Sequence, residues 1–280
     1  MNFETVPATN YSLPELVKLL NRGFEEYFIP IRFTADLFSN MLRKDGIALA
    51  DSQVLISDDQ ACGIALIAHR RAIHTSRLAA MGIAKEMRSK RAGSWFMQKL
   101  IDEAHKRGDR EMVLEVIEQN EPAVKLYRNY GFKPVRRLIG FRGTGRVSDV
   151  SSDDQSDLYQ IDLREMAGLI SQYGLSDLPW QLSEATIAQM NPLPHSYRSG
   201  QAYIVISDPE AEHVVIWSLL VKPEARGKGM GTELLKQVMT RYPGKTWHVP
   251  AVYPEELGKV FERAGFEREQ LSQWQMKLSL

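Results

Sequence analysis

Several features that mark other protein classes are scarce or missing from this sequence. It has one cysteine, Cys62, so no disulfide can form within the chain, and the neighbouring residues are typical of a buried strand. Its 35 basic and 35 acidic residues balance, and no basic stripe with interleaved aromatic residues occurs, which argues against a nucleic acid partner. No apolar run approaches the length of a membrane span, so no membrane partner is expected.

The start of the sequence, its length and its residue spacing add three expectations. The first residues lack the basic and apolar regions of a signal peptide, and together with the lack of a membrane-length apolar run this predicts a cytoplasmic protein. A chain of 280 residues is long enough for two domains, each with a core of its own. No residues have the spacing of metal ligands, so no metal site is predicted.

Two common nucleotide-binding motifs are incomplete. A dinucleotide site needs G-x-G-x-x-G, but the third glycine comes one position early, at Gly231. A phosphate-binding loop ending in Gly244-Lys245-Thr246 would need a glycine five residues before Gly244, where Met239 stands. Neither a Rossmann domain nor a phosphate-loop NTPase is therefore expected.

A glycine-rich, basic turn does follow an apolar strand that ends at Val221. Its glycines let backbone N–H groups approach a ligand closely, and the helix that begins after it adds unpaired donors and the positive end of a dipole. Such a turn is typical of a pyrophosphate site, and its predicted contacts are Val221, Arg226, Gly227, Lys228, Gly229, Gly231 and Thr232.

The same pattern occurs twice in the chain. Residues 80–94 align with 219–232, which places Ile83 against Val221, Arg88 against Arg226 and Gly93 against Gly231. Residues 123–132 align with the segment that ends at Gly265-Phe266. Two copies of one domain are the natural interpretation of this repeat.

Arg226-x-x-Gly229-x-Gly231, with a helix ending in Gly-Phe about forty residues later, resembles the coenzyme A signature of the GCN5-related N-acetyltransferase (GNAT) superfamily. The resemblance covers nearly the whole chain and implies acetyl-CoA as the cofactor. It implies the further coenzyme A contacts Met81, Gly82, Ile83, Arg88, Ser89, Lys90, Arg91, Ala92, Gly93, Ser94, Asn120, Ala123 and Tyr127. A tandem arrangement also resembles the mycothiol synthases, in which one half works and the other is structural.

The fold class that the resemblance implies is α+β (mixed α/β), with two tandem GNAT-like domains, each a mostly antiparallel twisted sheet flanked by helices. The expected domains are residues 1–145 and 158–280, joined by a linker at 146–157, which lies in a stretch, 142–157, that is rich in Gly, Ser and Asp. Apolar spacing predicts helices over 13–27, 34–43, 93–107, 122–130, 163–173, 183–190, 232–241 and 254–264. Strands are predicted over 53–57, 62–70, 77–84, 112–117, 201–207, 213–221, 246–249 and 274–278.

The two halves differ where chemistry would take place. In many GNAT enzymes a tyrosine four residues before the Gly-Phe pair protonates the leaving thiolate, and that position holds Tyr127 in the first half and Phe261 in the second. Asn120 matches an asparagine that bonds the pantetheine arm, although it also suits a helix N-cap. Arg91, however, stands where the second half has Gly229. We therefore expect catalysis in the first half, with Tyr127 as the general acid, although Tyr127 is equally compatible with a core position.

The sequence also offers candidates for the residues that bind and deprotonate the amine acceptor. Glu118, after the strand that precedes Asn120, is the candidate general base, with a solvated surface charge as the alternative. Glu25, Glu26, Tyr27 and Phe28, at the end of the first helix, are the predicted substrate-binding residues for a cationic amine.

The leading prediction is an N-acetyltransferase that moves the acetyl group of acetyl-CoA to a primary amine of a small molecule by direct attack. The alternatives are a non-catalytic acyl-CoA-binding or scaffold protein and a peptide or protein N-acetyltransferase. The chain is expected to be a monomer or a homodimer.

Overall fold

The computed structural model describes residues 2–88, 90–144 and 158–280, so the expected linker at 146–157 lies outside the described residues. The chain forms two compact units. Unit 1 comprises Met1–Val135 together with Trp274–Leu280, and unit 2 comprises Arg136–Gln273. None of the described helices is long and apolar enough to cross a membrane.

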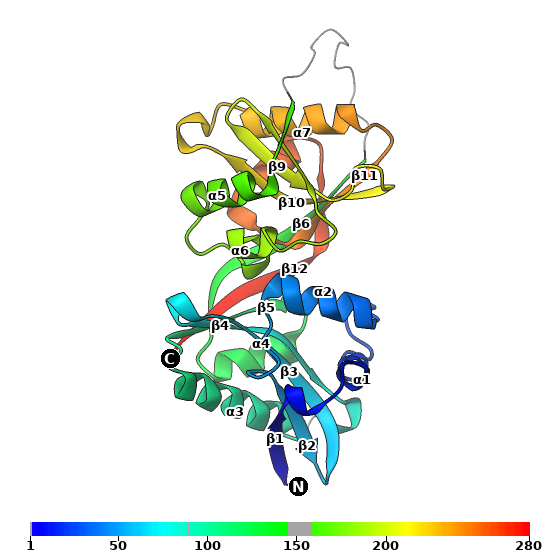
Figure 1. Cartoon of the computed structure of the whole chain (residues 1–280), viewed down its shortest axis with the longest axis vertical. Helices are drawn as coiled ribbons and strands as arrows, with labels where there is room; N and C mark the ends of the chain where they lie inside the picture. Colours follow the sequence, from blue (N-terminus) through cyan, green and yellow to red (C-terminus); the bar gives the residue numbers. More distant parts are fainter. Residues whose placement is uncertain (1, 89, 145–157) are drawn as a thin grey trace. The chain divides into compact units, whose positions relative to one another are not determined.

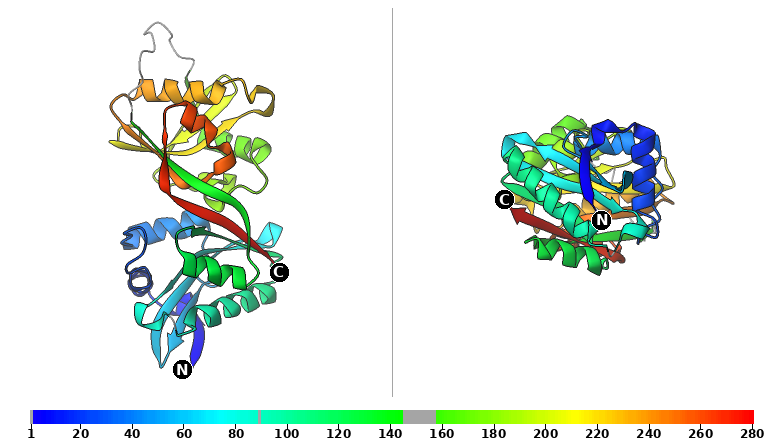
Figure 2. Two further views of the ribbon diagram at one scale, coloured as in Figure 1. Left: turned by 180° about the vertical axis from the view of Figure 1, so that it is seen from behind. Right: turned by 90° about the horizontal axis from the view of Figure 1, so that it is seen from below.

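Unit 1 has a mixed sheet with helices on both faces (Figure 1). Its elements are β1 (Phe3–Pro7), η1 (Ala8–Asn10), α1 (Leu13–Gly23), α2 (Ala35–Asp45), β2 (Gln53–Ser57), β3 (Gln60–Arg70), η2 (Arg71–Ile73), β4 (Thr75–Ile83), η3 (Lys85–Met87), α3 (Ala92–Arg107), β5 (Glu111–Ile117) and α4 (Glu121–Asn129). The strand order is β1-β2-β3-β4-β5-β12, and β4 and β5 pair in parallel. Figure 2 shows α1 and α2 on one face and α3 and α4 on the other.

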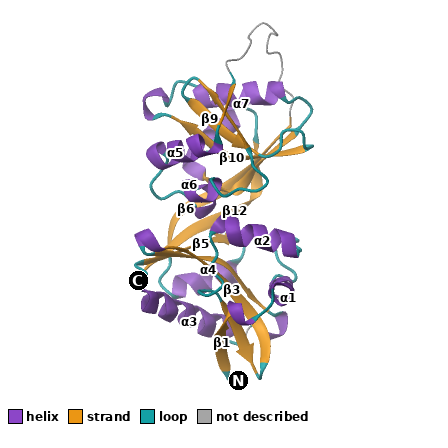
Figure 3. Cartoon of the chain, in the orientation of Figure 1, coloured by secondary structure: helices purple, strands orange, loops and turns teal. Residues whose placement is uncertain are grey.

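Unit 2 repeats this plan (Figure 3). Its elements are β7 (Tyr159–Ile161), α5 (Leu163–Tyr173), η4 (Trp180–Leu182), α6 (Glu184–Ile187), β8 (His195–Ser199), β9 (Ala202–Ile206), β10 (His213–Val221), η5 (Pro223–Ala225), α7 (Met230–Arg241), β11 (Thr246–Pro254), η6 (Glu255–Leu257) and α8 (Lys259–Arg263). The strand order is β6-β11-β10-β9-β8-β7, and β10 and β11 pair in parallel.

Each unit takes one strand segment from the other half of the sequence. Strand β6 (Lys133–Thr144) follows α4, yet most of its length pairs with β11 in unit 2. Strand β12 (Glu267–Ser279) follows α8, and its last residues belong to unit 1, where β12 neighbours β5. The compact units therefore do not coincide with consecutive halves of the chain.

A one-residue bulge interrupts the fourth strand of each sheet at the same place. The extra residue is Ala79 in β4 and Trp217 in β10. The fourth and fifth strands then pair only near their starts, over Thr75–Leu78 with Glu111–Leu114 in unit 1 and over His213–Val215 with Thr246–His248 in unit 2. Beyond those residues the facing backbone edges are open to other partners.

Most predicted elements are present, with shifted ends. The first helix ends at Gly23 and not at residue 27, and the strand expected over 246–249 continues to Pro254. Strands β1, β6, β7 and β8 were not predicted, because short or polar-rich strands lack a clear alternation of apolar residues. The buried strand around Cys62 is confirmed, and burial raises the pKa of its thiol.

Candidate functional site: a cleft in unit 2

The glycine-rich turn of unit 2 joins β10 and η5 to the start of α7. Gly227 and Gly229 have φ values of 78° and 82°, in the left-handed region that favours glycine. A Cβ atom built on either residue would meet no heavy atom within 4 Å, so the turn is open on its ligand side. Backbone N–H groups at the start of an α-helix then face this space, which is the arrangement that binds phosphate groups.

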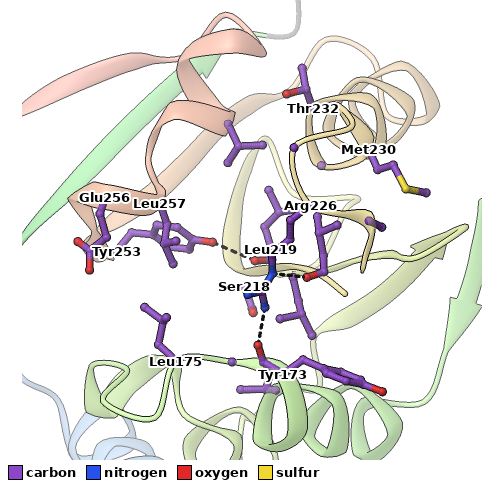
Figure 4. Close-up of a pocket in the computed structure, with 18 of the residues that line it drawn as sticks. Tyr173, Leu175, Ser218, Leu219, Arg226, Met230, Thr232, Tyr253, Glu256 and Leu257 are labelled. Carbon is purple, nitrogen blue, oxygen red and sulfur yellow. Dashed lines mark hydrogen bonds between the residues drawn. The ribbon is translucent and has the colours of Figure 1, made fainter. Parts of the chain in front are cut away.

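A cleft of about 320 Å³ lies beside this turn (Figure 4). It reaches from the turn along the end of β10 to the loop after α5, and it is bounded by η6 and α8. Its lining is mostly apolar with a few polar groups, as in small-molecule sites. The lining residues are Ile170, Tyr173, Gly174, Leu175, Leu178, Leu182, Ser218, Leu219, Leu220, Val221, Ala225, Arg226, Gly227, Gly229, Met230, Gly231, Thr232, Tyr253, Glu256, Leu257, Val260 and Arg263.

Tyr253 places a hydroxyl group in the gap between β10 and β11. Its Oη donates a hydrogen bond to the backbone oxygen of Leu219 at 3.1 Å (Figure 4). The residue is 4% exposed, and burial raises the pKa of its phenol above the ordinary value of 10.0. Tyr253 is therefore protonated at neutral pH and can donate a proton into the cleft.

The open edge of β10 also supplies backbone groups. The backbone oxygens of Leu219 and Val221 both face the gap, since they accept bonds from Tyr253 and Arg226. In an extended strand the N–H and C=O of one residue point to the same side, so the N–H groups of Leu219 and Val221 face the gap as well. They are suitably placed to bind carbonyl oxygens of a ligand.

Arg226 is a structural residue of this cleft. Its Nε donates to the Val221 oxygen at 3.0 Å and its guanidinium also donates to the Tyr173 oxygen at 2.7 Å. These bonds fix the C-terminal end of α5 beside β10. Arg88 repeats them in unit 1 with the Ile83 and Gly23 oxygens, both at 3.0 Å.

Two glycines bring α1 and β4 into close contact in the corresponding region of unit 1. Gly23 of α1 and Gly82 of β4 touch so closely that a Cβ on Gly23 would lie 2.8 Å from the Gly82 Cα. The matching positions in unit 2 are Tyr173 and Leu220, which pack in one apolar cluster with other residues of α5. The two glycines thus allow close backbone contact between α1 and β4, whereas large side chains stand at the matching places of unit 2.

Aromatic side chains occupy the rest of that region in unit 1. The Phe24 ring lies 3.2 Å from a Cβ built on Gly82, and it packs edge-on against Tyr27 with ring centroids 5.0 Å apart. Tyr27 hydrogen-bonds the Asn120 side chain, and burial raises its pKa. Asn120 also accepts a bond from the Ala123 N–H at 3.3 Å, as an N-cap does.

Tyr127 belongs to the hydrophobic core of unit 1. It packs edge-on against Phe132, and burial, with the nearby Tyr27, raises its pKa. Glu118 lines a surface groove along α4 together with Glu121 and Trp274. Tyr127 is not among the residues that line this groove. The roles assigned to Tyr127 and Glu118 stay predictions.

The remaining candidates of unit 1 lie around its own version of the turn. Arg91 adopts φ 64° at the N-cap of α3, where unit 2 has Gly229. Of its neighbours, Lys90 is exposed, Ala92 is buried, and the Ser94 oxygen accepts a bond from Tyr130. Gly93 packs on Ile83, Met81 lies at the end of β4, and Ser89 lies outside the described residues.

The predicted substrate residues lie at the start of the loop that follows α1. Glu26 pairs with Lys85 at 2.6 Å, Glu25 is exposed, and its backbone oxygen accepts a bond from Arg88 at 3.2 Å. Phe28 is 51% exposed and packs edge-on against Tyr27.

In unit 2, Lys228 is exposed, Thr232 lines the cleft, and Gly231 lets α7 pack against Val260 of α8.

The sequence profile of the acetyltransferase (GNAT) family matches residues 13–132 and 197–266, which together make up more than half of the chain. The protein belongs to the GNAT family. No curated protein sequence is similar enough to count as a match.

Solved structures share this GNAT fold at low sequence identity. A tandem GNAT protein from the clavulanic acid biosynthesis pathway has 15% identity and a TM-score of 0.68, with 99% of this chain and 98% of that chain covered. A GCN5-related N-acetyltransferase from Sphaerobacter thermophilus has 15% identity and a TM-score of 0.67 over 99% and 95% of the two chains. The tandem GNAT architecture predicted from the sequence is thus confirmed.

Sequence reasoning missed the polar groups of this GNAT cleft outside the glycine turn. Tyr253 lies at the end of a strand, eight residues before Phe261, and not at the helix position where the family tyrosine is sought. Ser218 of β10 was hidden inside an apolar run. The available signal for this part of the cleft was Tyr253 itself, a tyrosine near the end of β11, the strand that follows the glycine turn and α7.

The buried tyrosines of this GNAT protein predict a loss of stability at high pH. The folded state holds Tyr127 and Tyr253 in their neutral forms, because burial raises both pKa values. Their contribution to the free energy of unfolding is constant below pH 10, the ordinary tyrosine pKa, and falls as the pH rises above it. Urea unfolding between pH 8 and 11.5 measures this fall, which is expected to be shallower for the double variant Tyr127→Phe/Tyr253→Phe.

Proposed function

We propose that the protein is an acyl-CoA-dependent N-acyltransferase that acts in the cleft of unit 2 on a primary amine of a small molecule. The observation that carries the proposal is the Tyr253 hydroxyl, which lies in the gap between β10 and β11 next to an open glycine turn. The GNAT fold by itself supports acyl transfer in general, without a particular acceptor or a particular unit. The choice of unit 2 departs from the sequence-based expectation, which favoured the first half.

The residues of this cleft suit coenzyme A. Gly227 and Gly229 leave the turn open to a pyrophosphate, and the exposed Lys228 adds a positive charge there. The N–H groups of Leu219 and Val221 would hold carbonyl groups of the pantetheine arm and of the acyl thioester. Bound acyl-CoA would supply an activated acyl group as a thioester.

The side chains then account for proton transfer. The acceptor amine attacks the thioester carbonyl in its neutral form, after its ammonium form has lost one proton to the solvent. Formation of the amide bond then breaks the carbon–sulfur bond, and the sulfur that leaves takes the proton of the Tyr253 hydroxyl. The tyrosinate formed in this way is strongly basic because of its burial, so it takes up the proton that the acceptor nitrogen loses. Tyr253 is thereby restored without a separate base such as Glu118.

An exchange of residues between the two turns tests where coenzyme A binds. Gly229→Arg, which copies the residue of unit 1, is expected to weaken acetyl-CoA binding by about tenfold, because arginine brings a Cβ and a long side chain to the open turn. Arg91→Gly, the reverse change in unit 1, is the matched control and is expected to leave binding unchanged. Isothermal titration calorimetry gives both the affinity and the number of sites, for which we expect one per chain.

The opposite result would move the site. A changed affinity in Arg91→Gly together with normal binding in Gly229→Arg would place coenzyme A in unit 1, where Tyr127 and Asn120 lie. Binding without release of thiol for any member of a panel of amines would favour the acyl-CoA-binding or scaffold alternative. A peptide or protein acceptor would be recognised by turnover of peptides but not of small amines.

A further inference from the structure

We infer that the inner end of the unit 2 cleft is an acyl pocket, which makes the preferred donor an acyl-CoA whose acyl chain is apolar and longer than acetyl. This inference rests on the proposed function, since it assumes that coenzyme A binds at the glycine turn of unit 2. It adds the chemical class of the transferred group.

The order of groups along β10 gives the direction of the ligand. The glycine turn follows the C-terminal end of β10, so a ligand anchored there passes Val221 first and then Leu219, whose backbone oxygen accepts the Tyr253 hydrogen bond. A thioester beside the Tyr253 hydroxyl therefore has its acyl group directed onward, past Leu219. The next cleft residue of β10 in that direction is Ser218.

Apolar side chains line the cleft along α5, the loop after it and η4. Ile170 of α5, Leu182 of η4 and Leu220 of β10 are among the lining residues and are 3%, 3% and 8% exposed. The half-buried Leu178 lies in the same wall. An acetyl group offers a single methyl group to a cleft with this lining, whereas a longer apolar acyl chain fills more of it, and each further methylene group buried there adds affinity.

The charged residues of the cleft lie elsewhere or are already engaged. Arg226 donates to the Val221 and Tyr173 oxygens. Glu256 is half exposed and accepts a bond from Arg136 at 2.7 Å, and Arg263 belongs to α8, which packs against α7. Because no charged group lines the inner end, an ammonium group is better accommodated at the mouth, near the exposed Leu175, Leu257 and Glu256.

The chain-length dependence of binding tests the acyl pocket in the unmodified protein. Calorimetric titrations with coenzyme A, acetyl-CoA, butyryl-CoA and hexanoyl-CoA give four dissociation constants. Butyryl-CoA is expected to bind about tenfold more tightly than acetyl-CoA, from two further buried methylene groups, and hexanoyl-CoA at least as tightly. Equal affinities, or weaker binding of the longer chains, would overturn the acyl pocket but leave the coenzyme A site in place. Absence of binding by all four compounds would instead overturn the proposed function.

Two substitutions of Leu178 test whether the dependence of affinity on acyl chain length arises in this cleft. Leu178→Trp, which narrows the pocket, is expected to lower the affinity for hexanoyl-CoA by about tenfold and that for acetyl-CoA by much less. Leu178→Ala, which lengthens the pocket, is expected to shift the preference toward octanoyl-CoA. Leu193→Trp is the control, because Leu193 is 72% exposed and is not among the residues that line the cleft. Thermal unfolding identifies variants that fail to fold, and an equal loss for all chain lengths in folded Leu178→Trp would contradict the acyl pocket.

Discussion

Replacement of Tyr253 by phenylalanine is expected to lower kcat for acyl transfer by about 10²–10⁴-fold, while the dissociation constant for coenzyme A stays within about twofold. The substitution removes the proton donor but keeps the aromatic ring, which packs edge-on against Phe261 with centroids 4.9 Å apart. A loss confined to kcat would show that the hydroxyl acts during the reaction and not in binding.

Tyr127→Phe is the matched control for this experiment. It makes the same chemical change at a buried tyrosine of unit 1, and we expect it to leave kcat unchanged. Release of free thiol from the acyl-CoA, measured with a panel of primary amines, reports turnover for both variants. If kcat falls in Tyr127→Phe and not in Tyr253→Phe, the first half is the catalytic one, as the sequence alone suggested.

Replacement of Gly23 by alanine is expected to destabilise the protein by about 1–3 kcal/mol. The added Cβ would lie 2.8 and 2.9 Å from the Cα and C atoms of Gly82, which are backbone atoms and cannot rotate aside. Helix α1 would have to move away from β4. Chemical denaturation measures the change in the free energy of unfolding.

Gly168→Ala provides the comparison within unit 2. Gly168 lies inside α5, the counterpart of α1, and a Cβ built on it meets no atom within 4 Å. Because alanine has a higher helix propensity than glycine, this variant is expected to gain about 0.5–1 kcal/mol. A Gly23→Ala variant as stable as the parent would mean that α1 and β4 are not held in close contact in solution.

The parts of the fold that the sequence predicted are those with strong local patterns. The apolar spacing of α5 gave both of its ends, Leu163 and Tyr173, and the alternation in β10 gave His213 and Val221. The glycine turn was recognisable from Arg226, Gly229 and Gly231, since the required φ values limit the residue types that fit.

The features that decide between the two halves depend on contacts between distant residues. How closely the first helix approaches the fourth strand depends on pairs such as Gly23 with Gly82 and Tyr173 with Leu220, which no local pattern reveals. The position of the Tyr253 hydroxyl likewise depends on where β11 separates from β10. Comparison of single motif positions, such as Tyr127 with Phe261, therefore uses different evidence from the contacts on which the proposal for unit 2 rests.

Strands β6 and β12 give the duplicated chain the character of a domain swap within one polypeptide. A gene split at residues 146–157 would produce a first fragment without the residues 274–280 that complete unit 1, and a second fragment without the residues 136–144 that complete unit 2. Each fragment would instead carry a long strand whose pairing partners had been removed, which is a recognised cause of aggregation. The two halves of this protein are consequently expected to fold only together, even though one glycine turn and one cleft suffice for the proposed chemistry.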